Sequence, residues 1–301
     1  MEVAAIREKQ DQPARAEAQY RRILGMRPDD SAARAKLEAL YRNGGRWVEL
    51  AASLEERTDP RLGTAAPEAE RPALLRELAA IYVDHLGHPH DGIDTLERLR
   101  HLAPTDIGVL NDLGALYARV GRWSKVIETY SRIGEIAEGT PQARESLRKI
   151  AAIYETELEL PERAIDTYQH LVTQWPDDAE AFAALDRLCE AQARWSDLVE
   201  ILRRRSALAT VPDDRAKLLA RRAGVLMEWL NAPEEAAAAL RHARTIMPDD
   251  GALAERLVTA LYQAARHREA AAVLEGRIAS AADKKLGAGE LAALHIRLAQ
   301  I

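Results

Sequence analysis

The sequence has one cysteine, few aromatic residues and no excess of positive charge, and each shortage excludes a class of protein. With Cys189 alone, the chain can form neither an intrachain disulfide framework nor a cysteine-based zinc site. Aromatic residues make up 5% of the chain while alanine is abundant, which favours closely packed helices over sheets. The net charge of −6 provides no basic surface for duplex nucleic acid, so we expect no nucleic-acid partner.

The sequence also lacks a membrane-spanning or secretory segment. No apolar run approaches the roughly 20 residues that cross a bilayer, and residues 1–7 lack the charged and apolar regions of a signal peptide. Hydrophobic residues, at 47%, suffice for a core, and the 30% of charged residues interleave with them, which argues against disorder. We therefore expect a soluble, cytoplasmic protein with no membrane insertion.

What the sequence does contain is a repeat of about 72 residues. A glycine or alanine, an arginine and then a tryptophan recur at 45–47, 121–123 and 193–195, and a fainter copy with histidine in place of tryptophan lies at 265–267. Prolines recur at the same intervals of 76, 72 and 72 residues, at Pro28, Pro104, Pro176 and Pro248. A fixed period of this kind is typical of a repeat array, in which each unit buries its apolar face against its neighbours.

Each period divides into two helical hairpins, as residues 107–139 illustrate. The apolar positions of the first helix, at the i, i+3, i+4 and i+7 spacing, are Leu110, Leu113, Gly114 and Tyr117. Those of the second helix are Trp123, Val126, Tyr130 and Ile133. Gly121 lies in a connection short enough to force an antiparallel pair. We expect Gly114 to let the two helices approach closely, which offsets a loss of roughly 1 kcal/mol in helix propensity.

Prolines and aspartates mark the helix ends. Pro161 is expected in the first turn of a helix, where a missing amide costs nothing, and Pro89 and Pro233 hold the same repeat position. Pro176 ends a second helix, after which Asp177 or Asp178 can cap the amides of the next one.

This order of residues resembles the tetratricopeptide repeat, and in particular its large bacterial arrays. Some alternate units depart from that motif, because they lack the closing proline and have longer connections, and because Cys189 and His267 replace the usual aromatic residues. The resemblance implies an all-α fold, a right-handed α-solenoid of tandem antiparallel helical hairpins, or TPR-like superhelix, that forms one domain over residues 1–301. About seven hairpins with partial units at the ends are expected at approximately 1–30, 31–62, 72–104, 107–139, 144–176, 179–211, 216–248, 251–283 and 288–301.

The two ends differ from the middle of the array. Residues 14–26 are predicted to be a second helix with a short first helix before it, and residues 290–298 a first helix without a partner. That last helix would leave Leu291, Leu294 and Leu298 uncovered. We therefore expect either a segment of a longer array or ends that pair with another chain, by end-to-end self-association.

No catalytic residue, cofactor or metal site is expected. His85, His88 and His90 lie close together, but the corresponding loops of other repeats lack histidine, which favours a solvated loop over a metal site. Cys189 occupies an apolar stripe position and is predicted to be a buried thiol. Capping explains the acidic pairs, and no glycine-rich phosphate loop is present.

The tryptophans are predicted to have structural roles. Trp47, Trp123 and Trp195 are expected in the core at the hairpin turns. Trp175 and Trp229 fall outside the main stripe, which leaves open whether they are surface anchors or pack between repeats.

The resemblance implies that the first helix of each hairpin lines a concave groove that holds a peptide or helix of a partner. The residues beside the buried stripe on these helices include Arg42, Arg76, Asn111, Arg119, Arg148 and Arg187, with small residues Ala80, Ala115 and Ala152 between them. Arginine and asparagine side chains suit carboxylates, so the partner is expected to be acidic. Later in the chain Glu228, Glu255 and Tyr262 replace the arginines, which predicts a change of sign, and an ordinary solvated helix face is the alternative.

We therefore predict a non-catalytic protein-interaction scaffold that binds a partner peptide or helix along this groove. Two other hypotheses stay open. One is a recognition or regulatory arm of a larger multidomain enzyme, and the other is a self-assembling structural array.

Overall fold

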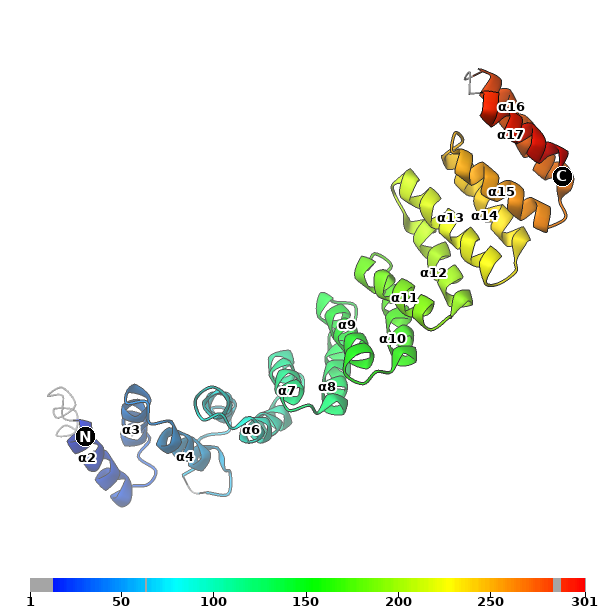
Figure 1. Ribbon diagram of the computed structural model, residues 1–301. Coiled ribbons are helices and arrows are strands. Elements are labelled where there is room, and N and C mark those ends of the chain that lie inside the picture. The colour runs from blue at the N-terminus through cyan, green and yellow to red at the C-terminus, as the bar shows by residue number, and fades with distance from the viewer. Residues whose placement is uncertain (1–12, 63, 284–287, 301) are drawn as a thin grey trace. The chain divides into compact units, whose positions relative to one another are not determined.

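A computed structural model describes residues 13–62, 64–283 and 288–300, and every regular element within them is a helix (Figure 1). This confirms the all-α fold predicted from the sequence. The chain divides into two compact units, unit 1 with residues 1–153 and unit 2 with residues 154–301. Among the described helices, none is both long and apolar enough to cross a bilayer.

Unit 1 is a succession of helical hairpins joined by short connections, except for the longer one over residues 59–70. Its helices are α2 (Pro13–Met26), α3 (Ser31–Asn43), α4 (Trp47–Thr58), α5 (Arg71–Ala80), the π-helix η1 (Ile81–His85), α6 (Pro89–Leu102), α7 (Ile107–Arg119), α8 (Trp123–Ile136) and α9 (Pro141–Thr156), whose last residues belong to unit 2. The short first helix predicted before α2 lies outside the described residues.

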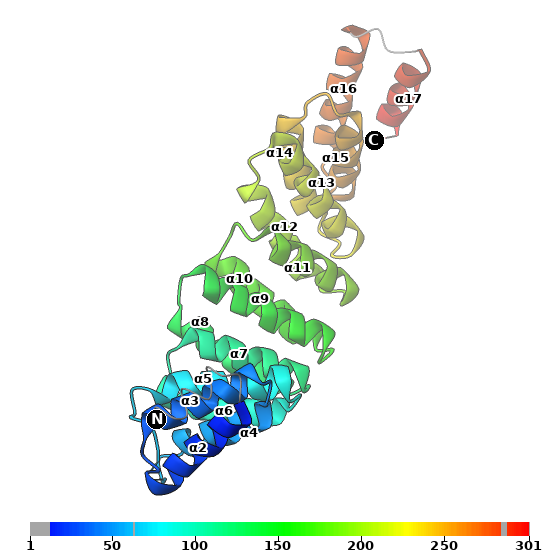
Figure 2. The ribbon, with the colours of Figure 1, turned by 90° about the vertical axis from the view of Figure 1, so that its left-hand side faces the viewer.

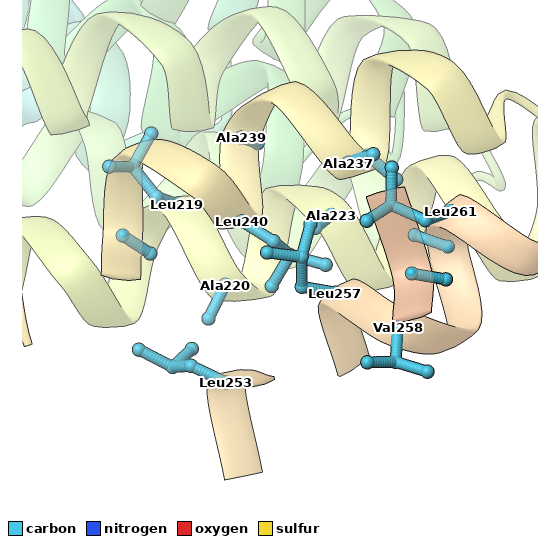
Figure 3. Packing of buried hydrophobic residues seen from close by; sticks show 14 of the residues in the cluster. Leu219, Ala220, Ala223, Ala237, Ala239, Leu240, Leu253, Leu257, Val258 and Leu261 are labelled. Carbon is cyan, nitrogen blue, oxygen red and sulfur yellow. The ribbon is translucent and has the colours of Figure 1, made fainter. Parts of the chain in front are cut away.

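Unit 2 continues the same alternation of helices. Its helices are α10 (Pro161–Gln174), α11 (Ala179–Ala191), α12 (Trp195–Leu208), α13 (Pro212–Glu228), α14 (Pro233–Ile246), α15 (Gly251–Gln263), α16 (His267–Asp283) and α17 (Ala288–Ala299). Successive helices α13, α14 and α15 pack side by side (Figure 2). Leucine and alanine side chains from these three helices, among them Leu219, Leu240 and Leu257, interlock in the core of the unit (Figure 3).

The predicted helix caps are present. Asp30, Asp106, Asp178 and Asp250 each precede the first helix of a hairpin and accept a backbone N–H from the residue three positions later, at 2.9–3.2 Å. Pro89, Pro161 and Pro233 lie in the first turns of α6, α10 and α14, as predicted. These caps satisfy amides that the first turn of a helix leaves without a partner, and they fix where each first helix begins.

The connection within a hairpin depends on one residue with positive φ. Gly45 and Gly121 adopt φ of 65° and 70°, and the residues at the same repeat position in unit 2, Ala193 and Ala265, adopt 53° and 57°. Glycine adopts this left-handed conformation without cost, whereas alanine is strained in it by about 1–2 kcal/mol. The turn is therefore imposed by the packing of the two helices at the alanine positions.

Close approach of the two helices in a hairpin follows from Gly114, as predicted. A Cβ atom at this position would lie 3.1 Å from Cζ of Tyr130, which is tighter than ordinary van der Waals contact. Tyr130 in α8 is buried against α7, with Leu110, Leu113 and Gly114 in the α7 stripe buried as well.

The last described helix differs from the prediction. Leu294 is only 6% exposed and belongs to the hydrophobic core of unit 2, and Leu298 packs against that core. Helix α17 contacts α16, and this contact covers the apolar side chains of α17. The side chain of Leu291 lies outside the described residues. The uncovered stripe that suggested end-to-end association is thus largely covered.

Candidate partner-binding site

The first helices α5 and α7 of unit 1, together with η1, border a hollow of about 320 Å³. Its walls carry Arg76, Ala80 and Asp84 on one side and Asp112, Ala115 and Arg119 on the other. Leu96 of α6 and Leu116 of α7, both buried, line it as apolar residues. We call this hollow the α5–α7 pocket. It brings together two of the arginines predicted as site residues, Arg76 and Arg119, with the predicted small residues Ala80 and Ala115.

Small side chains and a π-helix shape this pocket. Ala80 and Ala115 are exposed, so the backbone of α5 and α7 is reachable between the charged residues. In η1 the amide of Leu86 donates to the carbonyl of Ile81, a bond over five residues that widens the helix. Val83 and Asp84, both in η1, line the pocket.

Arg76 forms an ion pair across the hairpins. Its Nη2 lies 2.8 Å from Oδ2 of Asp106, the residue that caps α7. Burial raises the pKa of Asp106. The backbone N–H of Val109 and the guanidinium of Arg76 outweigh this effect and hold the pKa below its usual value. Arg76 thus links α5 to the first turn of α7.

Arg119 and Asp112, on the other wall of the pocket, are not joined in an ion pair as Arg76 and Asp106 are. Within the described part of the chain, the guanidinium of Arg119 forms no ion pair or hydrogen bond, and the residue is exposed at the end of α7. Burial raises the pKa of Asp112, and the charge of Asp106 adds to this while that of Arg76 opposes it. The pocket therefore holds one available cation, Arg119, one paired cation, Arg76, and the two carboxylates of Asp84 and Asp112.

The other predicted site residues of unit 1 lie outside the α5–α7 pocket. Arg42 of α3 donates from Nε to Oε1 of Glu77 in α5 at 3.0 Å. Arg148 of α9 lies 3.8 Å from Glu145 on the same helix. Asn111 is exposed on α7 beside Asp112. The structure thus places each of these residues on a first helix, as expected, but pairs both arginines with carboxylates.

Arg187, the predicted site residue of unit 2, is also paired. Its Nη1 lies 2.5 Å from Oε1 of Glu155, and this hydrogen bond raises the pKa of Arg187. The Arg187 side chain is exposed, whereas that of Glu155 is largely buried.

These pairs are what the sequence reasoning missed. The prediction considered each arginine on its own helix, whereas Glu77 and Asp106 belong to the next hairpin along the chain, 35 and 30 residues away. A comparison of charges one hairpin apart would have revealed both pairs. The face is therefore a ladder of ion pairs with Arg119 available, rather than a uniformly basic groove.

Unit 2 has a second hollow, of about 670 Å³, along α13. We call it the α13 pocket. Four of its residues, Ala220, Gly224, Glu228 and Arg256, lie 144 residues, or two periods, after Arg76, Ala80, Asp84 and Asp112 of the α5–α7 pocket. The small residue and the first acid are kept, but the arginine becomes alanine and the second acid becomes Arg256. The two pockets therefore occupy the same repeat face with different charges.

The tryptophans at the hairpin turns are half-buried, rather than fully in the core as predicted. Trp47 stacks on His85 of the next hairpin with ring centroids 3.7 Å apart, and Trp195 stacks on Trp229 at 4.4 Å. His85 and Trp229 hold the same repeat position. The histidine loop is therefore not simply solvated, since His85 covers a tryptophan and His88 lies 3.2 Å from Asp91.

Cys189 is fully buried, as predicted, and burial raises the pKa of its thiol to about 11. Such a thiol is a poor nucleophile. Among the residues that the structure describes, no three or more histidine, cysteine or acidic side chains are grouped so that they could hold a metal ion.

Parts of the chain are similar to known proteins. Residues 181–216 match the family model of the tetratricopeptide repeat. No curated protein matches the chain. Solved structures similar to it include a tetratricopeptide repeat protein from Parabacteroides merdae, with 15% identity, coverage of 86% of this chain and 96% of that one, and a TM-score of 0.36.

Two further solved structures are similar. One is the complex of Naa15 and Naa10 bound to HypK-THB, with 17% identity, coverage of 93% of this chain and 41% of that one, and a TM-score of 0.45. The other is YrrB, described as a tetratricopeptide repeat protein with an unusual peptide-binding site, with 13% identity, coverage of 62% and 90%, and a TM-score of 0.35.

The matched residues 181–216 cover most of α11, all of α12 and the start of α13, and so coincide with a hairpin that recurs along the chain at the 72-residue period. The resemblance drawn from the sequence is therefore confirmed: residues 181–216 match the tetratricopeptide repeat, and the same pattern of hairpins recurs along the chain.

Proposed function

We propose that this protein is a non-catalytic scaffold that binds an extended acidic segment of a partner protein on its first-helix face, with the α5–α7 pocket as the contact in unit 1. The tetratricopeptide repeat is typically a scaffold for protein–protein interaction, which supports the general role. The observation that carries the finer proposal is that Arg119, an exposed arginine without an internal partner among the described residues, lines the same pocket as Arg76.

The acidic preference depends on the available guanidinium of Arg119, because the pocket also holds the carboxylates of Asp84 and Asp112. A carboxylate of the partner would pair with Arg119 at once, because that guanidinium gives up no bond to the described part of the chain. The same or the next carboxylate would share Arg76 with Asp106. Planar guanidinium groups bind carboxylates with two parallel hydrogen bonds, which gives the site its selectivity.

The size of the pocket fits a short stretch of polypeptide. A volume of about 320 Å³ accommodates a few side chains, and the apolar Leu96 and Leu116 offer contact for an aliphatic group between two acidic ones. The partner segment would then be extended, with carboxylates flanking an apolar residue.

Selection from a random peptide display library tests this proposal, because such a library offers acidic, basic and apolar segments alike. The wild-type protein should enrich peptides that are rich in Asp and Glu, and the double variant Arg76→Glu and Arg119→Glu should lose that enrichment. The matched control is Arg100→Glu with Arg132→Glu, which makes the same change in net charge at a hollow that α6 and α8 line elsewhere in unit 1. The proposal fails if the library yields no acidic consensus or if both double variants behave alike.

A further inference from the structure

Trp229 is an exposed aromatic residue with one face covered and one face open. It is 57% exposed, yet its ring lies nearly parallel to that of Trp195, with an angle of 12° between the planes. The stack fixes the orientation of the indole and leaves its second face toward the solvent in the α13 pocket. Among aromatic side chains, tryptophan binds a cation over its ring face most strongly, and here that face is open and held in a fixed orientation.

The charge next to this ring is negative. Glu228 precedes Trp229, is exposed, lines the same pocket and forms no ion pair with any described residue. Glu234 and Glu235 follow at the start of α14, and the sequence from 223 to 240 contains no lysine or arginine. Glu228 is therefore an available carboxylate directly beside the open indole face.

Glu228 is also placed against its own helix. It is the last residue of α13, where the negative end of the helix dipole makes a carboxylate unfavourable. A cation bound beside Glu228 would relieve this repulsion.

The basic residues of the α13 pocket are engaged or remote. Arg221 pairs with Asp186 and with Glu190, and Arg256 donates to the carbonyl of Ala220 at 2.6 Å. Lys217 precedes Glu228 by 11 residues, which places it about 16 Å away along the axis of α13. Within the described residues, none of these three side chains forms an ion pair with Glu228.

We propose that Trp229 and Glu228 bind an arginine or lysine side chain of a partner polypeptide, with the cation over the open indole face and its N–H groups donating to the carboxylate of Glu228. This site rests on none of the residues of the α5–α7 pocket, and its charge preference is the opposite one. The scaffold would then bind an acidic residue of a partner with unit 1 and a basic residue with unit 2.

Fluorine NMR of the full chain labelled with 5-fluorotryptophan tests this site, with the Trp229 signal assigned from the Trp229→Phe variant. The probe is the peptide acetyl-Gly-Gly-Arg-Gly-Gly-amide in the millimolar range at low salt. The reference peptide carries citrulline, which keeps the shape of arginine and removes its charge. We expect the arginine peptide to shift the Trp229 signal saturably, with an affinity about three to thirty times that of the citrulline peptide.

Substitutions separate the two contacts. Glu228→Gln should weaken binding of the arginine peptide about twofold to fivefold, whereas Glu275→Gln, an equal charge change on exposed α16, should leave it unchanged. The proposal is overturned if the Trp229 signal does not move, if citrulline and arginine peptides bind equally, or if a glutamate peptide binds more tightly than either. Loss of acidic-peptide selection by unit 1 variants would not alter any of these results.

Discussion

Trp229 covers Trp195 face to face, with ring centroids 4.4 Å apart, and so joins the end of α13 to the start of α12. His85 covers Trp47 in the same way two periods earlier. The aromatic residue at the start of each of these second helices is therefore a contact between hairpins, and not only part of the core within one hairpin. A stack of this kind makes the stability of one hairpin depend on the next.

This coupling can be measured with a double-mutant cycle. Trp195→Leu, Trp229→Ala and the double variant should give an interaction free energy of about 0.5–1.5 kcal/mol in urea unfolding. A cycle between Trp195 and the exposed Tyr262, which contacts His267 instead, is the control and should give a value near zero. Additive effects at Trp195 and Trp229 would contradict the assigned stack.

The left-handed turn residue predicts opposite effects at equivalent positions. Ala193→Gly should raise the free energy of unfolding by about 0.5–1 kcal/mol, because glycine adopts the positive φ without strain. Gly121→Ala should lower it by about 1–2 kcal/mol, although no atom lies within 4 Å of the new Cβ. As a control, Ala183→Gly on the exposed side of α11 should lower stability by about 1 kcal/mol. Denaturation in urea decides the signs.

The close contact at Gly114 predicts that alanine at this position lowers the stability of the protein. Gly114→Ala gains helix propensity but forces the buried ring of Tyr130 to move, so we expect a net loss of about 1 kcal/mol. Gly134→Ala in α8 gains the same propensity with nothing within 4 Å, and should be neutral or stabilising by up to about 1 kcal/mol. Equal stabilisation by both changes, measured by thermal or urea unfolding, would show that α7 and α8 are not in close contact.

Cys189 predicts a pH dependence. Its pKa is raised from about 9 in the unfolded chain to about 11 in the folded one, because burial disfavours the thiolate. The contribution to stability is complete below pH 9 and is lost as the pH rises through 11, since the unfolded state releases its proton first. The stability of the Cys189→Ala variant should fall less steeply between pH 9 and 11 than that of the wild type, while the alkaline dependence from Tyr82 and Tyr117, whose pKa values burial also raises, remains. The folded thiol should also react with a disulfide reagent at about pH 8 far more slowly than the urea-unfolded thiol does.

Much of the fold could be predicted from the sequence because its determinants are local. The period of apolar residues, the first-turn prolines and the capping aspartates each act within a few residues, and Asp178 and Pro161 are found in the predicted roles. Burial of Cys189 followed from its place in the stripe alone.

The site could be predicted only in part, because its charges depend on residues one hairpin away. The face that carries Arg76 and Arg119 followed from the stripe and the resemblance, but the pairing of Arg76 with Asp106 and of Arg187 with Glu155 required the register between helices. The π-helix η1 was also missed, since nothing in residues 81–85 interrupts the helical pattern. Burial of Leu294 was missed because it depends on how α17 folds back on α16, which no local pattern specifies.

Site-specific photocrosslinking is the most direct test of the proposed binding face. The photoreactive residue p-benzoylphenylalanine in place of Ala115 lies in the α5–α7 pocket, and the same residue in place of Ser131 lies in the hollow that α6 and α8 line. With an acidic peptide from the display selection, we predict a crosslink from position 115 that Arg76→Glu with Arg119→Glu abolishes, and none from position 131. A crosslink from position 131 alone, or one from position 115 that survives the double substitution, would contradict the proposal that the first-helix face binds the partner through these arginines.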